Sequence, residues 1–128
     1  MRDPAAAPDA ERLRAVVMDA ARSWRAARDG GAPSQPSLYC ALERNDCGIL
    51  APAFDSVMRL CERCLERPMC VGCPLARARD EALIGDLVAD PSQARALFAC
   101  EDEPSPLSQA FICALRSTRI MLEQTLAA

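Results

Sequence analysis

Cysteines are the residues of this sequence best able to do chemistry, and four of its eight cysteines are closely spaced. They form two successive Cys-x-x-Cys pairs, Cys61 with Cys64 and Cys70 with Cys73. Residues three apart share a helix face, so each pair can direct two sulfurs at one point. A chain reversal at Pro68 would bring together four thiolates, the number that a closed tetrahedral zinc site requires. The sequence therefore predicts a metal site at these four cysteines, with zinc as the favoured ion.

A different choice of ligands replaces the last of these cysteines with Cys47. Cys47, Cys61, Cys64 and Cys70 give a remote cysteine followed by C-x₂-C-x₅-C. In that spacing alone the sequence resembles the WhiB-like iron–sulfur regulators, and the resemblance implies a cluster held by those four residues. The tryptophan-centred glycine turn of that family is missing downstream, since the only tryptophan is Trp24. An iron–sulfur cluster is therefore an alternative cofactor, and the family is not assigned.

The cysteines could also serve only as packing residues, with no cofactor. Cys61 and Cys64 continue an apolar stripe that includes Leu50 and Phe54, and a buried free cysteine behaves as a small hydrophobe. A thiol redox sensor is the weaker alternative, because redox Cys-x-x-Cys pairs usually stand in a βαβ setting. No strand pattern is present around these cysteines.

The elements that must position the cysteines are helices, because apolar residues recur at helical spacing throughout. The six predicted helices run from Asp9 to Gly30, from Ser37 to Asn45, from Ala51 to before Pro68, from Pro74 to Val88, from Asp90 to Glu101, and from Ser105 nearly to Ala128. Residues 32–36 are predicted to be a linker and residues 1–8 a disordered N-terminus. The first apolar stripe comprises Leu13, Val16, Val17, Ala20, Trp24 and Ala27, and the last comprises Leu107, Phe111, Ala114, Leu115, Thr118, Met121 and Leu122. We therefore expect an all-α fold: a compact single-domain bundle over 9–128, with a cysteine-bearing helical hairpin.

Composition argues against several functional classes. Without histidine or lysine there is no imidazole base and no Cys–His nucleophile pair, and no glycine loop could cradle a phosphate; we expect no enzyme. The net charge is −3, without the basic excess of a nucleic-acid surface. No apolar run approaches the roughly 20 residues of a membrane span, and the N-terminus lacks a secretory h-region, so a cytoplasmic location is expected.

Two charged features could each be a binding surface or simply a solvated surface. The first is a basic face on the first helix, comprising Arg12, Arg14, Arg22, Arg25 and Arg28 with Trp24, and the second is the acidic run Glu101–Glu103. Acidic residues interrupt the basic face, so a solvated surface is the preferred interpretation of both. The sequence thus predicts a small non-catalytic helical protein with a cysteine-ligated metal site and a regulatory or adaptor role through protein contacts. The alternative is a metal-free helical interaction module; the protein partner and the oligomeric state are unknown from sequence.

Overall fold

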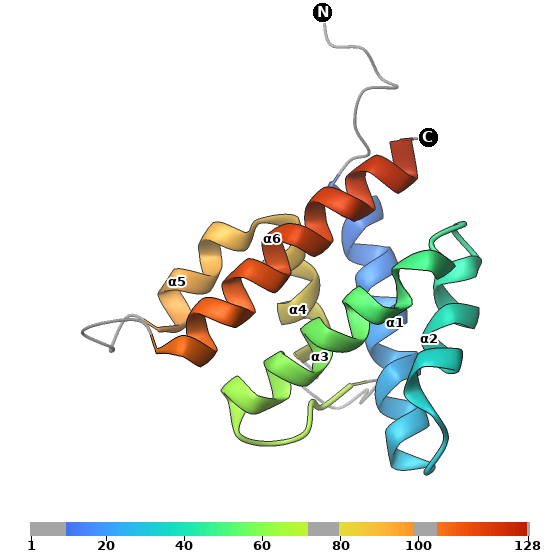
Figure 1. Cartoon of the computed structure of the whole chain (residues 1–128), viewed down its shortest axis with the longest axis horizontal. Helices are drawn as coiled ribbons and strands as arrows, with labels where there is room; N and C mark the ends of the chain where they lie inside the picture. The colour runs from blue at the N-terminus through green and yellow to red at the C-terminus, as the bar shows by residue number, and fades with distance from the viewer. Residues whose placement is uncertain (1–9, 72–79, 99–104, 128) are drawn as a thin grey trace, which may run out of the picture.

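In a computed structural model of the chain, the described residues are 10–71, 80–98 and 105–127. They form six α-helices and two short 3-10 helices, and these ranges contain no strand (Figure 1). The elements are α1 (Ala10–Asp29), α2 (Ser34–Glu43), η1 (Gly48–Leu50), α3 (Ala51–Leu65), α4 (Asp80–Ala89), η2 (Pro91–Gln93), α5 (Ala94–Leu97) and α6 (Pro106–Ala127). The predicted all-α fold is confirmed. The predicted disordered segment, residues 1–8, lies outside the described ranges.

The helices surround one hydrophobic core. Helices α3 and α6 pack together, and α1 packs against α2 on one side and α4 on the other (Figure 1). All six residues of the stripe predicted for α1 are buried, whereas the stripe predicted for α6 buries Phe111, Leu115, Thr118 and Leu122. Trp24, Phe54 and Phe111 are the largest fully buried side chains. Burial of each phenylalanine ring contributes about 1.5–3 kcal/mol to the stability of the fold.

Three helices meet at the carboxylate of Asp55 on α3. Trp24 Nε1 of α1 donates to Oδ1 at 2.8 Å, Ser34 Oγ of α2 donates to the same oxygen at 3.0 Å, and Arg59 Nε donates to Oδ2 at 2.9 Å. Burial raises the pKa of Asp55, but the hydrogen bonds from Arg59, Trp24 and Ser34 outweigh burial and hold it below its ordinary value. A buried carboxylate is tolerated only with such partners. Asp55 therefore fixes how α1, α2 and α3 are placed relative to one another.

Helix α2 begins earlier than predicted. The sequence pattern placed its start at Ser37 after a linker over 32–36, whereas the helix begins at Ser34. Pro36 lies in the first turn, where backbone N–H groups have no partner within the helix, so its missing N–H costs no hydrogen bond there. The linker prediction was wrong over 34–36, because Pro36 occupies a first-turn position that a helix tolerates.

Helix α3 begins at Ala51 with a proline in its first turn and ends at Leu65, before Pro68, as predicted. Glu66 follows in the left-handed region with φ of 60°, a conformation common just after a helix C-terminus. The helix predicted from Pro74 is described only from Asp80 onwards. Its first six predicted residues lie outside the described ranges.

The last two predicted helix starts are confirmed. Asp90 Oδ1 accepts hydrogen bonds from Ser92 N at 3.3 Å and from Ser92 Oγ at 2.6 Å, and Ser105 Oγ accepts one from Ser108 N at 3.1 Å. These are the side-chain caps that the sequence pattern indicated. Helix α5 ends at Leu97, short of the predicted end near Glu101, and residues 99–104 lie outside the described ranges.

Candidate functional site

The structure places the predicted cysteine ligands in different surroundings. Cys61 on α3 is buried and Cys64, one turn later, is half-buried, whereas Cys70 is exposed in the segment after the helix. Cys47 is buried beside η1 and, like Cys61, belongs to the hydrophobic core. Cys73 lies outside the described residues. The predicted tetrad is therefore described for three of its four members.

Cys61 and Cys64 share one face of α3, as their spacing predicted, and that face points into the protein. Both line a cavity of about 120 Å³, and its other lining residues are all apolar: Leu65, Leu83, Leu87, Leu97, Phe98 and Phe111. Phe98 and Phe111 contact edge to face, with ring centroids 6.5 Å apart. Among such neighbours the two thiols act as small apolar groups. This arrangement supports the packing alternative for this pair.

The chain reverses after α3 and returns to the start of α4. Met69 N donates to Glu62 Oε2 at 2.8 Å, and Cys70 N donates to Asp80 Oδ2 at 2.6 Å. Arg67 binds both oxygens of Asp80, at 2.6 and 3.1 Å. The hydrogen bond from Arg67 lowers the pKa of Asp80, which burial opposes and the Cys70 amide supports. The turn lies at Glu66 and Arg67, just before the predicted position at Pro68.

The thiol of Cys61 keeps its proton at neutral pH. Burial, followed by the charges of Asp80, Cys64 and Glu62, raises the pKa of Cys61 to about 12. The thiolate is the form that attacks electrophiles and binds metals. At neutral pH this side chain is therefore a neutral thiol, and a metal ion would have to displace its proton.

No three cysteine, aspartate or glutamate side chains in the described parts of the chain are grouped closely enough to hold a metal ion. The alternative cluster set lies wholly within those parts, and its remote member is far from the others. Cys47 precedes α3, and Cys61 lies ten residues after Ala51, about 15 Å further along the helix axis. The structure does not bring Cys47 to Cys61 and Cys64.

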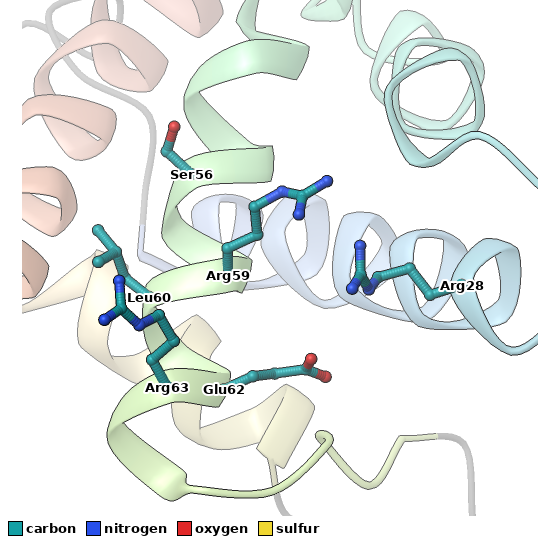
Figure 2. Close-up of a pocket in the computed structure, with 6 residues that line it drawn as sticks. All are labelled: Arg28, Ser56, Arg59, Leu60, Glu62 and Arg63. Carbon is teal, nitrogen blue, oxygen red and sulfur yellow. The ribbon is translucent and has the colours of Figure 1, made fainter.

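A second candidate site is a groove between the last turns of α1 and helix α3, here called the arginine groove. Figure 2 shows the residues that line it: Arg28, Ser56, Arg59, Leu60, Glu62 and Arg63. Its volume is about 580 Å³. The side chains of Arg28 and Arg59 extend toward one another from opposite walls (Figure 2).

Contacts inside the protein orient these arginines. The guanidinium carbon of Arg28 lies 4.9 Å from the centroid of the Trp24 ring, a cation–π contact. Arg59 donates a hydrogen bond from Nε to Asp55, and 51% of the Arg59 side chain is exposed. Glu62 is neutralised by Arg25 from α1. The ion pairs found among the described residues include neither Arg28 nor Arg63.

Sequence reasoning missed this groove. It grouped Arg28 with the other arginines of α1 and with Trp24, but Trp24 is fully buried and is not part of a surface face. Three of those arginines form ion pairs within the fold: Arg14 with Asp86, Arg22 with Glu81 and Arg25 with Glu62. The available signal was the spacing of Ser56, Arg59 and Arg63 on one helix face.

Comparisons with protein-family models, curated proteins and solved structures find no match for this chain. Within the described ranges, none of the helices is both long and apolar enough to cross a membrane. The candidate sites therefore rest on the chain's own residues.

Proposed function

We propose that this chain is a non-catalytic cytoplasmic protein that acts through contacts with a protein partner, in a regulatory or adaptor role. The arginine groove is the observation that supports this proposal. Arg28 and Arg63 have no carboxylate partner among the ion pairs of the described residues, and Arg59 is half exposed. Guanidinium groups recognise carboxylates through paired N–H donors. An acidic segment of another protein is therefore the occupant that the groove fits best.

The surroundings of these arginines favour their charge, and within the described residues no hydrogen bond engages the terminal nitrogens of Arg28 or Arg59. Arg28 and Arg63 lie in the last turns of α1 and α3, where a cation is favoured by about 0.3–1 kcal/mol. Arg59 donates to Asp55 through Nε at 2.9 Å. The N–H groups that face the groove are left to bind an anion from outside.

The test is binding of a fluorescein-labelled peptide of alternating glutamate and glycine, followed by anisotropy. The Arg28→Gln/Arg63→Gln double variant should weaken binding about tenfold or more, because each charge-assisted hydrogen bond contributes about 1.5–3 kcal/mol. A matched control is Arg95→Gln/Arg116→Gln, which removes two exposed arginines from the groove between α5 and α6. Equal loss in both double variants, or equal binding of a glutamine–glycine peptide, would contradict the proposal.

Zinc binding by Cys61, Cys64, Cys70 and Cys73 is a second candidate. Its support is the chain reversal after α3, in which the amide of Cys70 is held by Asp80. Cys70 is then anchored beside the start of α4, and Cys73 follows three residues later in sequence. A structural zinc site would stabilise this hairpin and thereby the surface that the protein presents to its partner.

Elemental analysis combined with an absorption spectrum, on protein purified without oxygen, tests this second candidate. One equivalent of zinc without visible absorption would support it. A coloured protein containing iron would indicate a cluster instead. Protein that is folded but contains neither metal would favour the packing alternative.

A further inference from the structure

We propose that the arginine groove binds a phosphate monoester on a serine or threonine of the partner protein. The phosphate group binds between Arg28 and Arg59. This inference rests on the proposed function, because it specifies the anion that occupies the same groove. It goes further in assigning the affinity to a single dianionic group and not to a series of carboxylates.

Arg59 is oriented to present one edge of its guanidinium. Its Nε donates to Asp55 at 2.9 Å, and Asp55 is itself held by Trp24 and Ser34. The two terminal nitrogens, which make no hydrogen bond within the described parts of the chain, stay available to an anion. Two parallel N–H donors from one guanidinium match two oxygens of a phosphate. Because Asp55 already fixes Arg59, little side-chain entropy remains to be lost on binding.

Arg28 approaches from the opposite wall. Its guanidinium stacks on the buried Trp24 ring, the same ring whose Nε1 binds Asp55. One buried tryptophan and one buried carboxylate therefore orient both arginines, which converge across the groove (Figure 2). Two guanidiniums that meet from opposite sides suit a tetrahedral group with three acceptor oxygens. A planar carboxylate has only two oxygens to offer.

The rest of the groove is consistent with a dianion. Arg63 follows Arg59 by one helical turn and Ser56 precedes it by one, so a further cation and a hydroxyl line the groove, although the Arg63 side chain extends from α3 away from Arg28 (Figure 2). The single acid of the lining, Glu62, is occupied by Arg25 and by the amide of Met69. The C-terminal ends of α1 and α3 oppose an anion weakly, and the guanidiniums of Arg28 and Arg59 outweigh that effect.

The experiment titrates ¹⁵N-labelled protein with three nonapeptides that differ only at the central residue: phosphoserine, glutamate or serine. The phosphoserine peptide should bind about tenfold or more tightly than its glutamate twin and should shift the Nε–Hε signals of Arg28 and Arg59. Arg28→Gln should weaken binding severalfold, Arg63→Gln should weaken it less because that side chain extends away from Arg28, and Arg95→Gln should not weaken it. Neither groove variant removes an ion pair found in the structure, so the spectra should otherwise stay those of the folded protein.

Each other outcome overturns the inference in a recognisable way. Equal binding of the phosphoserine and glutamate peptides would leave the acidic-partner function standing and remove the phosphate preference. If none of the peptides bound, and the glutamate–glycine peptide also failed, the groove would lose both assignments. Equal binding of inorganic phosphate, or tighter binding of a single-stranded oligonucleotide, would show a general anion site and would also overturn it.

Discussion

Trp24 and Asp55, which are 31 residues apart in sequence, are joined by a buried hydrogen bond of 2.8 Å between the indole Nε1 and the carboxylate. The indole ring supports Arg28 from one side, and the carboxylate supports Arg59 from the other. The contact that fixes α1 against α3 therefore also sets the two arginines that face the groove.

Asp55→Ala should lower the free energy of unfolding by about 3–5 kcal/mol, because it leaves the buried Trp24 N–H and the Ser34 hydroxyl without their partner. Urea denaturation followed by far-UV circular dichroism measures this change. The control is Asp19→Ala, which removes the more exposed ion pair with Arg44 and should cost less than about 1 kcal/mol. Similar losses in the two variants would contradict the structural role given to Asp55.

Stability should fall in acid because the pKa values of Asp55 and Asp80 are lowered in the folded protein. Each group binds its proton more readily in the unfolded chain, where the ordinary value is about 3.9. Their contribution is therefore complete well above that value and is lost as pH falls through the lower folded-state pKa. Thermal melts at several values from about pH 6 to pH 2 should show this decline. Asp55→Asn should make the decline shallower, and an unchanged slope would count against the assignment.

Phe111→Ala should destabilise the protein by about 3–5 kcal/mol. The ring is 1% exposed, packs edge to face on Phe98 and borders the small apolar cavity, so its removal enlarges an existing void. Ile120→Ala on the same helix provides the control. Its side chain is 55% exposed, and the change should stay within about 0.5 kcal/mol. A near-neutral effect of Phe111→Ala would show that the ring is not a core residue.

Serine substitutions of single cysteines distinguish a zinc site, an iron–sulfur cluster and simple packing. If the first tetrad binds zinc, Cys64→Ser and Cys73→Ser should each lower metal content and melting temperature, because an open site loses binding energy that supports folding. Cys47→Ser should leave the metal content unchanged, and the exposed Cys113 is the control for both measurements. If an iron–sulfur cluster is bound instead, Cys47→Ser should lower the metal content and Cys73→Ser should leave it unchanged. With packing alone, Cys61→Ser should destabilise modestly in a protein that contains no metal.

Local sequence signals were sufficient for most of the helix ends that the structure describes. Two helix starts, at Asp90 and Ser105, and the end of α3 before Pro68 were predicted correctly. Capping and the restriction that a proline imposes act over three or four neighbouring residues, so a local pattern is enough to find them. The stripe through Val17 and Trp24 identified the buried face of α1, because helical periodicity alone decides which residues share a face. At Pro36 the same local reasoning failed, since a proline in a first turn and one in a linker have the same sequence context.

The candidate sites depended on how the helices pack. Whether Cys61 faces the core or an ion, and whether Cys47 lies near it, depends on distances between segments that no spacing rule contains. Arg28 and Arg59 come from different helices and extend toward one another because Asp55 joins α1 to α3 (Figure 2). The amino-acid sequence by itself determined the all-α class and the buried stripe of α1, because both follow from backbone geometry repeated along the chain. Only the tertiary structure decided that a buried carboxylate would orient two arginines toward one groove, because hydrogen bonds and charge act through space between helices that the sequence does not place.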